Sequence, residues 1–399
     1  MKISDLDAAI RRKYGIKRLT RENIQAIQLE GLNRMLSAEK RRGGFYAGLP
    51  DKLGSMAELS TLPFTTPKDL AERGGSMLLL SQSEIQRVIT GATSGTTGES
   101  KRVFYTERDC RETVEFFAAG LSELVKPGSK TLIAMPFSGP HGLGELISDA
   151  IESLGAEPLR AGAGLTFGEY ALVMEEKRPD AFVGMPVQLL SILRFGGRGF
   201  LQKALVSGDA CPESVMRGIG DFGLELFPHY GCREMGLGGA VTCPAHQGMH
   251  LRENHTAAEI IGPDGAPLPT GQEGELVLTT FGMEAMPLVR YRTGDRARIL
   301  PSPCPCGSEL IRLDGVGRRD NIMELLDGAV FSQPGAVDYS ATVKDGETVL
   351  RVLTSEEFDG SRALEAAAEL GLPQPRTEIR KCRPTDRGAY RGKRIINTV

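Results

Sequence analysis

The sequence contains no tryptophan, and it has only 7 cysteines and 5 histidines among 399 residues. No run of 18 or more apolar residues occurs, so we expect no membrane-spanning helix. The formal net charge is −3 and there is no basic tail, which argues against a nucleic-acid partner. The first residues resemble the start of an amphipathic helix rather than a signal peptide. An odd, scattered set of cysteines indicates a reducing compartment, so we expect a cytoplasmic protein.

Apolar residues make up 40% and charged residues 25% of the chain, which is typical of a globular protein with more than one domain. Residues 1–43 have apolar positions at near-helical spacing. Between 109 and 230, short apolar strands alternate with amphipathic helices, which predicts a mostly parallel sheet buried on both faces. Residues 256–300 read as antiparallel strands. The fold class is therefore α/β, with a β subdomain in the large N-terminal part.

The chain after residue 318 reads as a separate small α+β unit, so we expect an N-terminal domain at 1–318 and a C-terminal domain at 319–399. The expected helix of this unit runs over 362–370, and the expected strands lie near 321–325, 337–343, 349–353 and 377–381.

A glycine- and hydroxyl-rich loop joins two strand-like segments, from Gly91 to Lys101. Glycines allow successive N–H groups to point into one concavity, hydroxyls add neutral donors, and Lys101 adds a positive charge. This chemistry suits a polyphosphate. The spacing fits neither the Walker A loop nor a dinucleotide fingerprint, and on local grounds a flexible hairpin loop remains an alternative.

Three later stretches carry polar groups, two of them next to expected strands. Tyr230-Gly-Cys-Arg-Glu234 offers an aromatic face for a purine and a carboxylate for Mg²⁺. The alternative is a turn after a strand, with a tyrosine in the core and a glutamate on the surface. The segment Tyr291-Arg-Thr-Gly-Asp295 ends on a carboxylate that could accept both ribose hydroxyls, or it is a tight turn. The pair Gly392-Lys393 lies near the C-terminus, where a lysine is usually a solvated charge.

Together these motifs, with Gly317-Arg-Arg-Asp320, closely resemble those of the adenylate-forming superfamily of acyl-CoA synthetases, in the same order. The branch they resemble is that of the phenylacetate–CoA ligases. The resemblance covers about residues 60–399. It implies a small mobile C-terminal domain that rotates about a hinge at Asp320 between two half-reactions.

The resemblance also implies roles for individual residues. Lys393, Glu234 and Arg318 would be catalytic: Lys393 would stabilise charge developing during adenylation, Glu234 would bind Mg²⁺, and Arg318 would contact ribose or phosphate. Asp295 would hold the ribose, and Tyr230 the adenine. Cys232 stands where the superfamily often has a hydroxyl. The full set expected to bind ATP or AMP is Thr93, Ser94, Gly95, Thr96, Thr97, Gly98, Lys101, Gly208, Asp209, Tyr230, Gly231, Cys232, Asp295 and Arg318.

A further set of cysteines and histidines suits a metal ion better than catalysis. Cys243, His246 and His250 are followed by Cys304-Pro-Cys306, and zinc prefers four ligands of this kind. Unligated buried thiols with surface histidines are the alternative. The resemblance to the branch selects Cys243, His250, Cys304 and Cys306, with His246 as substitute, and implies a structural Zn²⁺ site.

The implied activity is that of a ligase with Mg·ATP. A carboxylic acid, with an aryl acid of the phenylacetate kind favoured, forms acyl-AMP and pyrophosphate, and coenzyme A then takes the acyl group. Transfer to a carrier protein or another coenzyme is one alternative, and a non-catalytic nucleotide-binding protein is another. We expect the acid pocket at Phe137, His141, Met185, Gly236 and Gly238. The sequence leaves a homodimer open.

Overall fold

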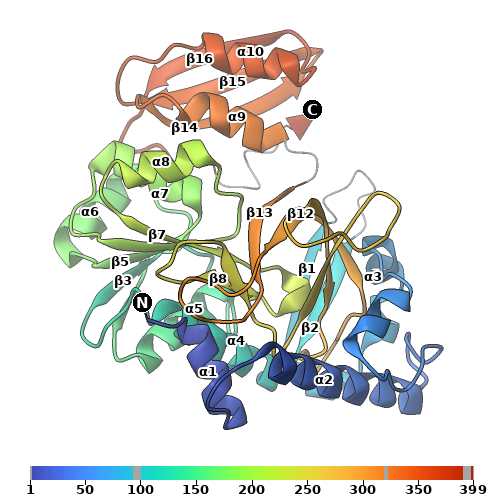
Figure 1. Cartoon of the computed structure of the whole chain (residues 1–399). Coiled ribbons are helices and arrows are strands. Elements are labelled where there is room, and N and C mark those ends of the chain that lie inside the picture. Colours follow the sequence, from blue (N-terminus) through green and yellow to red (C-terminus); the bar gives the residue numbers. More distant parts are fainter. Residues whose placement is uncertain (1, 93–99, 319–321, 390–396, 399) are drawn as a thin grey trace. The chain divides into compact units, whose positions relative to one another are not determined.

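The computed structural model describes residues 2–92, 100–318, 322–389 and 397–398 (Figure 1). The chain forms two compact units: residues 1–123 with 229–319, and residues 124–228 with 320–399. The hinge predicted at Asp320 lies outside the described residues, and the domain division at 318/319 stays a prediction. Among the described helices, none combines the length and the apolar character that crossing a membrane requires.

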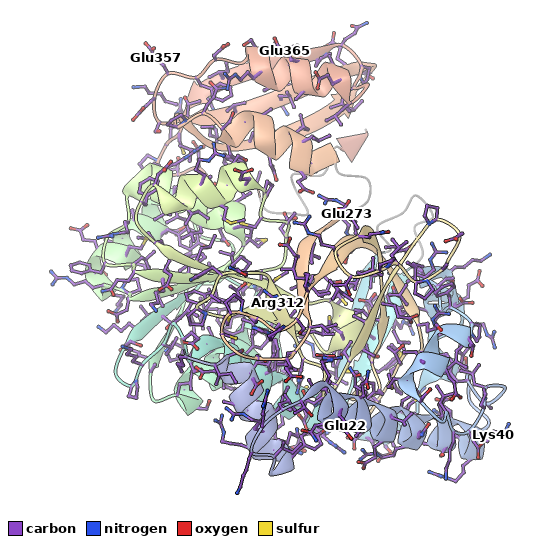
Figure 2. All side chains as sticks on the ribbon, in the orientation of Figure 1. Glu22, Lys40, Glu273, Arg312, Glu357 and Glu365 are labelled. Atoms are coloured by element: carbon purple, nitrogen blue, oxygen red, sulfur yellow. The ribbon has the colours of Figure 1, made fainter. Side chains whose placement is uncertain are left out.

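Two helices begin the first unit, as the spacing of apolar residues predicted: α1 (Asp5–Tyr14) and α2 (Arg21–Arg42). The Thr20 side chain accepts the Asn23 N–H in a capping box, which fixes the start of α2. Gly43, with φ of 70°, ends it. One face of α2 is buried in an apolar cluster that includes Leu32 and Leu36, whereas Glu22 and Lys40 project from it (Figure 2). The amphipathic pattern therefore determines which face of α2 is buried.

The rest of the first unit is mainly antiparallel sheet. Its larger sheet has the order β10-β11-β12-β13-β9-β8, and β1 and β2 form a separate antiparallel hairpin. The predicted β-rich character of residues 256–300 is confirmed. The elements are α3 (Pro67–Arg73), β1 (Arg87–Ala92), β2 (Ser100–Tyr105), α4 (Glu107–Leu121), β8 (Ala240–Thr242), β9 (Met249–Leu251), β10 (Ala257–Ile261), β11 (Glu273–Thr279), β12 (Tyr291–Leu300) and β13 (Arg312–Arg318).

The second unit begins with the predicted parallel sheet, whose strand order is β7-β6-β5-β3-β4. All four residues of β5 are buried, as expected for a strand covered on both faces. The elements are β3 (Lys130–Ile133), α5 (Leu143–Ser153), β4 (Glu157–Arg160), α6 (Phe167–Lys177), β5 (Ala181–Gly184), α7 (Pro186–Gly196), β6 (Lys203–Val206), α8 (Glu213–Gly220) and β7 (Glu225–Tyr230), whose last two residues belong to the first unit.

The C-terminal part of the second unit is a sheet of order β16-β15-β14-β17 with α9 and α10 against it (Figure 1). The strand expected at 321–325 is wrong, because a helix runs from Ile322. Leu326 and Val330, four residues apart, are both fully buried, so this short apolar run has helical spacing. The elements are α9 (Ile322–Phe331), β14 (Ala336–Lys344), β15 (Glu347–Thr354), α10 (Ser361–Glu369), β16 (Pro375–Lys381) and β17 (Asn397–Thr398).

Candidate functional site

Three buried side chains of the first unit form one hydrogen-bonded group. Lys101 Nζ donates to Tyr291 Oη at 2.8 Å and lies 3.4 Å from Glu234 Oε1. Tyr291 Oη donates to the same carboxylate oxygen at 3.0 Å. Lys101, Tyr291 and Glu234 are 7%, 2% and 6% exposed. Two residues predicted to contact phosphate and Mg²⁺ are therefore held together by a third.

The energetics explain why the tyrosine is needed there. An ion pair at this distance gains on the order of 5 kcal/mol at an effective dielectric constant of 20. Removing two charges from water costs several kcal/mol for each ion, so the pair alone does not offset its desolvation. The Tyr291 hydroxyl, which accepts from Lys101 and donates to Glu234, supplies the remaining hydrogen bonds. Although burial raises the pKa of Glu234, Lys101 lowers it below its ordinary value overall, so the carboxylate stays ionised.

A second tyrosine holds the other predicted carboxylate of the nucleotide site. Tyr230 Oη donates to Asp295 Oδ2 at 2.8 Å, and Arg318 Nη1 lies 3.1 Å from Asp295 Oδ1. Both oxygens of Asp295 are thus paired, and Arg318, which is partly exposed, is placed beside the carboxylate predicted to hold ribose. Asp295 and Tyr291 belong to the same strand, β12, which brings the two tyrosine–carboxylate pairs into one region of this unit.

The loop after β7 takes its shape from close backbone contacts. A Cβ at Gly231 would lie 2.0 Å from the Leu237 carbonyl oxygen, so only glycine fits at that position. Leu237 itself has φ of 67°. The Tyr105 hydroxyl donates to the Arg233 carbonyl oxygen at 2.5 Å and fixes the backbone beside Glu234. Cys232 is half-buried, and burial together with Glu234 raises the pKa of its thiol, which is therefore neutral at neutral pH.

Two glycines of this loop were predicted to line the acid pocket. A Cβ at Gly238 would lie 2.3 Å from the Phe116 ring, and one at Gly236 would lie 3.1 Å from the Met283 sulfur. Thr113 Oγ1 donates to the Gly236 carbonyl oxygen at 2.7 Å. Gly238 is therefore packed against α4, which leaves no room there for a side chain.

The second unit contains the other predicted ATP and acid-pocket residues, which we describe within that unit. Gly208 has φ of 84°, and a Cβ there would lie 3.6 Å from Met185 Cγ. Asp209 Oδ1 accepts the Ala210 N–H at 2.9 Å. The Phe137 ring lies beneath the Arg160 guanidinium, 4.5 Å from its carbon, and His141 has φ of 59°.

Several predicted site residues lie outside the described residues. They are the phosphate-loop positions Thr93, Ser94, Gly95, Thr96, Thr97 and Gly98, the hinge Asp320, and Lys393. Their assignments stay predictions.

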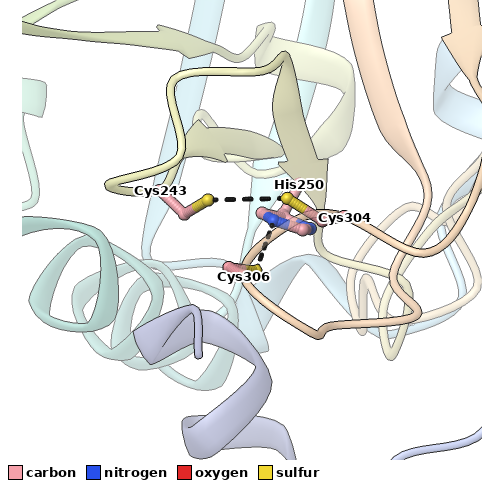
Figure 3. A group of neighbouring side chains, drawn as sticks. All are labelled: Cys243, His250, Cys304 and Cys306. Atoms are coloured by element: carbon pink, nitrogen blue, oxygen red, sulfur yellow. Dashed lines mark hydrogen bonds between the residues drawn. The ribbon is translucent and has the colours of Figure 1, made fainter. Parts of the chain in front are cut away.

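Four predicted metal ligands lie together in the first unit (Figure 3). The ligand atoms of Cys243, His250, Cys304 and Cys306 are within 4.8 Å of one another, and all four residues are buried. Cys243 Sγ lies 3.8 Å from Cys304 Sγ, and Cys306 Sγ lies 3.5 Å from His250 Nε2. His246 is exposed and outside this group.

These distances fit a tetrahedral metal ion. Bonds of about 2.3 Å to sulfur and about 2.0–2.1 Å to nitrogen give tetrahedral edges of about 3.8 Å between sulfurs and about 3.6 Å between sulfur and nitrogen. The hydrogen bond between Cys243 and Cys306 lowers the pKa of the Cys306 thiol and raises that of the Cys243 thiol, and His250 lowers the pKa of Cys306 further. The pair therefore favours a thiolate, the form that binds a metal, at Cys306. Four protein ligands with no open position suit a structural Zn²⁺ rather than a catalytic one.

Buried polar groups hold the two loops that carry the three cysteines, whereas His250 lies in β9. The Arg312 guanidinium, labelled in Figure 2, donates to the carbonyl oxygens of Gln247 and Pro301, one in each loop. Ser308 Oγ donates to Asp7 Oδ2 of α1 at 2.7 Å. The ligand set is thus fixed by contacts from β13 and from the first helix.

Sequence reasoning missed the residues that orient the predicted ones. Tyr291 enters the prediction only as part of a motif, and Tyr105, Arg312 and Asp7 are not among the predicted site residues. For Tyr291 the signal was present, because its motif was already expected to carry a site residue. The other three contact loops distant in sequence, which no local spacing reveals.

The chain matches the family model described as "AMP-binding enzyme" over residues 92–284. It is 30% identical over 332 residues to the phenylacetate–coenzyme A ligase of Thermus thermophilus. The aligned part covers 77% of this chain and 73% of that protein. The chain is 31% identical to the phenylacetate–coenzyme A ligase of Aromatoleum evansii, over 78% of this chain and 74% of that protein. A crystal structure of 2-hydroxyisobutyryl-CoA ligase in the postadenylation state has a similar fold, with a TM-score of 0.76, 20% identity, and coverage of 94% and 90% of the two chains.

Proposed function

The chain belongs to the adenylate-forming, AMP-binding enzymes, in the branch of the phenylacetate–coenzyme A ligases, and from this premise we propose how its residues act. The protein is a ligase that activates a carboxylic acid with ATP to an acyl-adenylate and then transfers the acyl group to coenzyme A. The observation that carries the proposal is the pairing of Lys101 with Glu234 and of Tyr230 with Asp295 in one unit.

In the first half-reaction the acid's carboxylate oxygen attacks the α-phosphorus, and pyrophosphate leaves. Asp295 accepts the ribose hydroxyls, and Arg318, next to it, contacts ribose or phosphate. The loop from Thr93 to Gly98 and the Lys101 ammonium bind the β- and γ-phosphates and the departing pyrophosphate. Glu234 holds Mg²⁺, which neutralises phosphate charge when bound. Lys393 stabilises the charge that develops on the carboxylate and the α-phosphate.

The acid is an aryl acid of the phenylacetate kind. Both relatives compared above are phenylacetate–coenzyme A ligases, which supports this class. The expected pocket residues are Gly236 and Gly238 in the first unit and Phe137, His141 and Met185 in the second. The acceptor in the second half-reaction is the thiol of coenzyme A, after rotation of the small domain about Asp320.

Exchange of labelled pyrophosphate into ATP tests this function. Purified protein with Mg·ATP is assayed against phenylacetate, benzoate, short alkyl acids and no acid, and thioester formation is then followed after coenzyme A is added. Exchange that depends on an aryl acid, followed by thioester, is expected. Exchange with short alkyl acids alone would refute the aryl class, and no exchange with any acid would refute the activity.

We also propose that Cys243, His250, Cys304 and Cys306 bind a structural Zn²⁺. The support is the match of two separations, Cys243 to Cys304 and Cys306 to His250, to tetrahedral edges, together with the lowered pKa of the Cys306 thiol. The ion would join the loop between β8 and β9 to the loop between β12 and β13. Its role is to hold the sheet that presents Asp295 and Tyr291, without taking part in the reaction.

A further inference from the structure

The contacts among Lys101, Tyr291 and Glu234 affect how a divalent cation can reach the Glu234 carboxylate. The carboxylate predicted to bind Mg²⁺ already has a cation beside it, because Lys101 Nζ lies 3.4 Å from Glu234 Oε1. The Tyr291 hydroxyl donates to that same oxygen at 3.0 Å. Any divalent cation that approaches Glu234 must therefore displace or face the ammonium group.

The tyrosine sets the position of the lysine. Lys101 Nζ is closer to Tyr291 Oη, at 2.8 Å, than to the carboxylate, and it also lies 5.6 Å from the centre of the tyrosine ring. Tyr291 is 2% exposed. The single proton of its hydroxyl is directed to Glu234, while its oxygen accepts from Lys101.

We propose that Tyr291 is a positioning residue that holds Lys101 against Glu234 and so closes this carboxylate to a free divalent cation. Phosphate groups are the natural competitor for the ammonium. When nucleotide phosphates bind Lys101, the lysine leaves the carboxylate, and Glu234 becomes available to the cation that arrives with the nucleotide. The inference rests on the proposed role of Glu234 and Lys101 in binding Mg·ATP.

The main consequence is that removing the Tyr291 hydroxyl or the Lys101 ammonium should strengthen the binding of a free divalent cation. Tyr291→Phe removes the hydroxyl that anchors Lys101 and occupies Glu234, so free Mn²⁺, used as a probe for Mg²⁺, should bind more tightly without nucleotide. Lys101→Met removes the competing cation and should strengthen Mn²⁺ binding further, by tenfold or more. Damage to the fold would weaken binding instead, so this readout separates positioning from a merely structural role.

Tyr105→Phe is the matched control. Tyr105 is 1% exposed and its hydroxyl donates to the Arg233 carbonyl, next to Glu234, but it contacts neither Lys101 nor the carboxylate. Because Tyr105 acts only on the backbone beside Glu234, this variant should show no gain in affinity for free Mn²⁺ over the wild type. Glu234→Gln, alone and combined with Lys101→Met, measures Mn²⁺ bound elsewhere, and the combination should abolish the gain.

The experiment is a titration of the zinc-loaded full chain with Mn²⁺, followed by the electron paramagnetic resonance of the free ion. The Michaelis constant for Mg·ATP in pyrophosphate exchange is measured in parallel, and Tyr291→Phe should raise it. Unchanged Mn²⁺ affinity in both Tyr291→Phe and Lys101→Met overturns the inference, as does an equal gain in Tyr105→Phe. Absence of exchange in the wild type would instead contradict the proposed function, and the Mn²⁺ titration would still decide the inference.

Discussion

Replacing one cysteine of the proposed zinc site should have a much larger effect than replacing a comparable cysteine elsewhere. Cys304 and Cys110 are both buried, 2% and 3% exposed, but only Cys304 belongs to the group of four ligands. Cys304→Ala and Cys110→Ala therefore remove the same atom from similarly buried positions of the same unit. Only the first should release metal.

The magnitude follows from the ligand set. Structural zinc sites contribute roughly 10–16 kcal/mol of apparent binding free energy, and a variant that releases the ion loses most of that contribution. At roughly 2–4 °C per kcal/mol for a compact unit of this size, the thermal midpoint should fall by roughly 20 °C or more. Cys110→Ala should cost about 1 kcal/mol through the small cavity that it leaves.

The assay combines metal analysis of the purified proteins with thermal unfolding. The wild type and Cys110→Ala should contain about one zinc per chain, and Cys304→Ala should contain little. Prolonged chelation of the wild type should reproduce the lower midpoint of Cys304→Ala. A wild type without stoichiometric zinc, or equal destabilisation by the two variants, would refute the reasoning.

Three further predictions use single side chains. Asp295→Asn should weaken ATP binding by about tenfold or more in an equilibrium titration, because a charge-assisted acceptor for ribose becomes a neutral one; unchanged affinity would exclude the ribose role. Arg194→Ala should lower the free energy of unfolding, measured with denaturant, by about 2–4 kcal/mol, because the Arg194 guanidinium donates to the carbonyl oxygens of Phe331, Gln333 and Ala336. Arg217 on α8 is exposed, so the control variant Arg217→Ala should lower it by less than about 0.5 kcal/mol. Asp338 is fully buried, and burial raises its pKa to about 7, so the protonated form favours folding and that contribution is lost as the pH rises from about 4 to about 7. Relative to Asp338→Asn, the wild type should lose about 4 kcal/mol of unfolding free energy between pH 4 and pH 8, and identical pH dependence of the two would contradict the assignment.

Much of the fold follows from the periodicity of apolar residues. The alternation of β5, α7, β6 and α8 could be predicted because each strand is a short, mainly apolar run that is followed by a longer stretch of helical length. The segment from Ile322 was predicted to be a strand and is a helix, because a short apolar run alone does not distinguish a strand from the start of a helix. Burial of Leu326 and Val330 against the rest of the unit favours the helix there, and that packing is not visible locally.

Only part of the candidate site could be predicted from the sequence. Glu234, Asp295 and the four predicted metal ligands stand in motifs whose residue types indicate the chemistry that we propose for them. The side chains that orient them come from distant strands: Tyr291 is 57 positions from Glu234, and Arg312 is 65 from Gln247. A tyrosine in a strand usually reads as core, so its hydroxyl contacts with a lysine and a carboxylate could be found only once the strands were paired.

The most direct test of the central claim follows oxygen atoms from the acid. Phenylacetate labelled with ¹⁸O in both carboxylate oxygens is incubated with the enzyme, Mg·ATP and coenzyme A, and the AMP released is analysed by mass spectrometry. Attack of the carboxylate on the α-phosphorus places one labelled oxygen in AMP when the thiol releases it. One ¹⁸O atom in AMP is the predicted result. Label found in inorganic phosphate together with ADP, or absent from AMP while thioester forms, would contradict the acyl-adenylate.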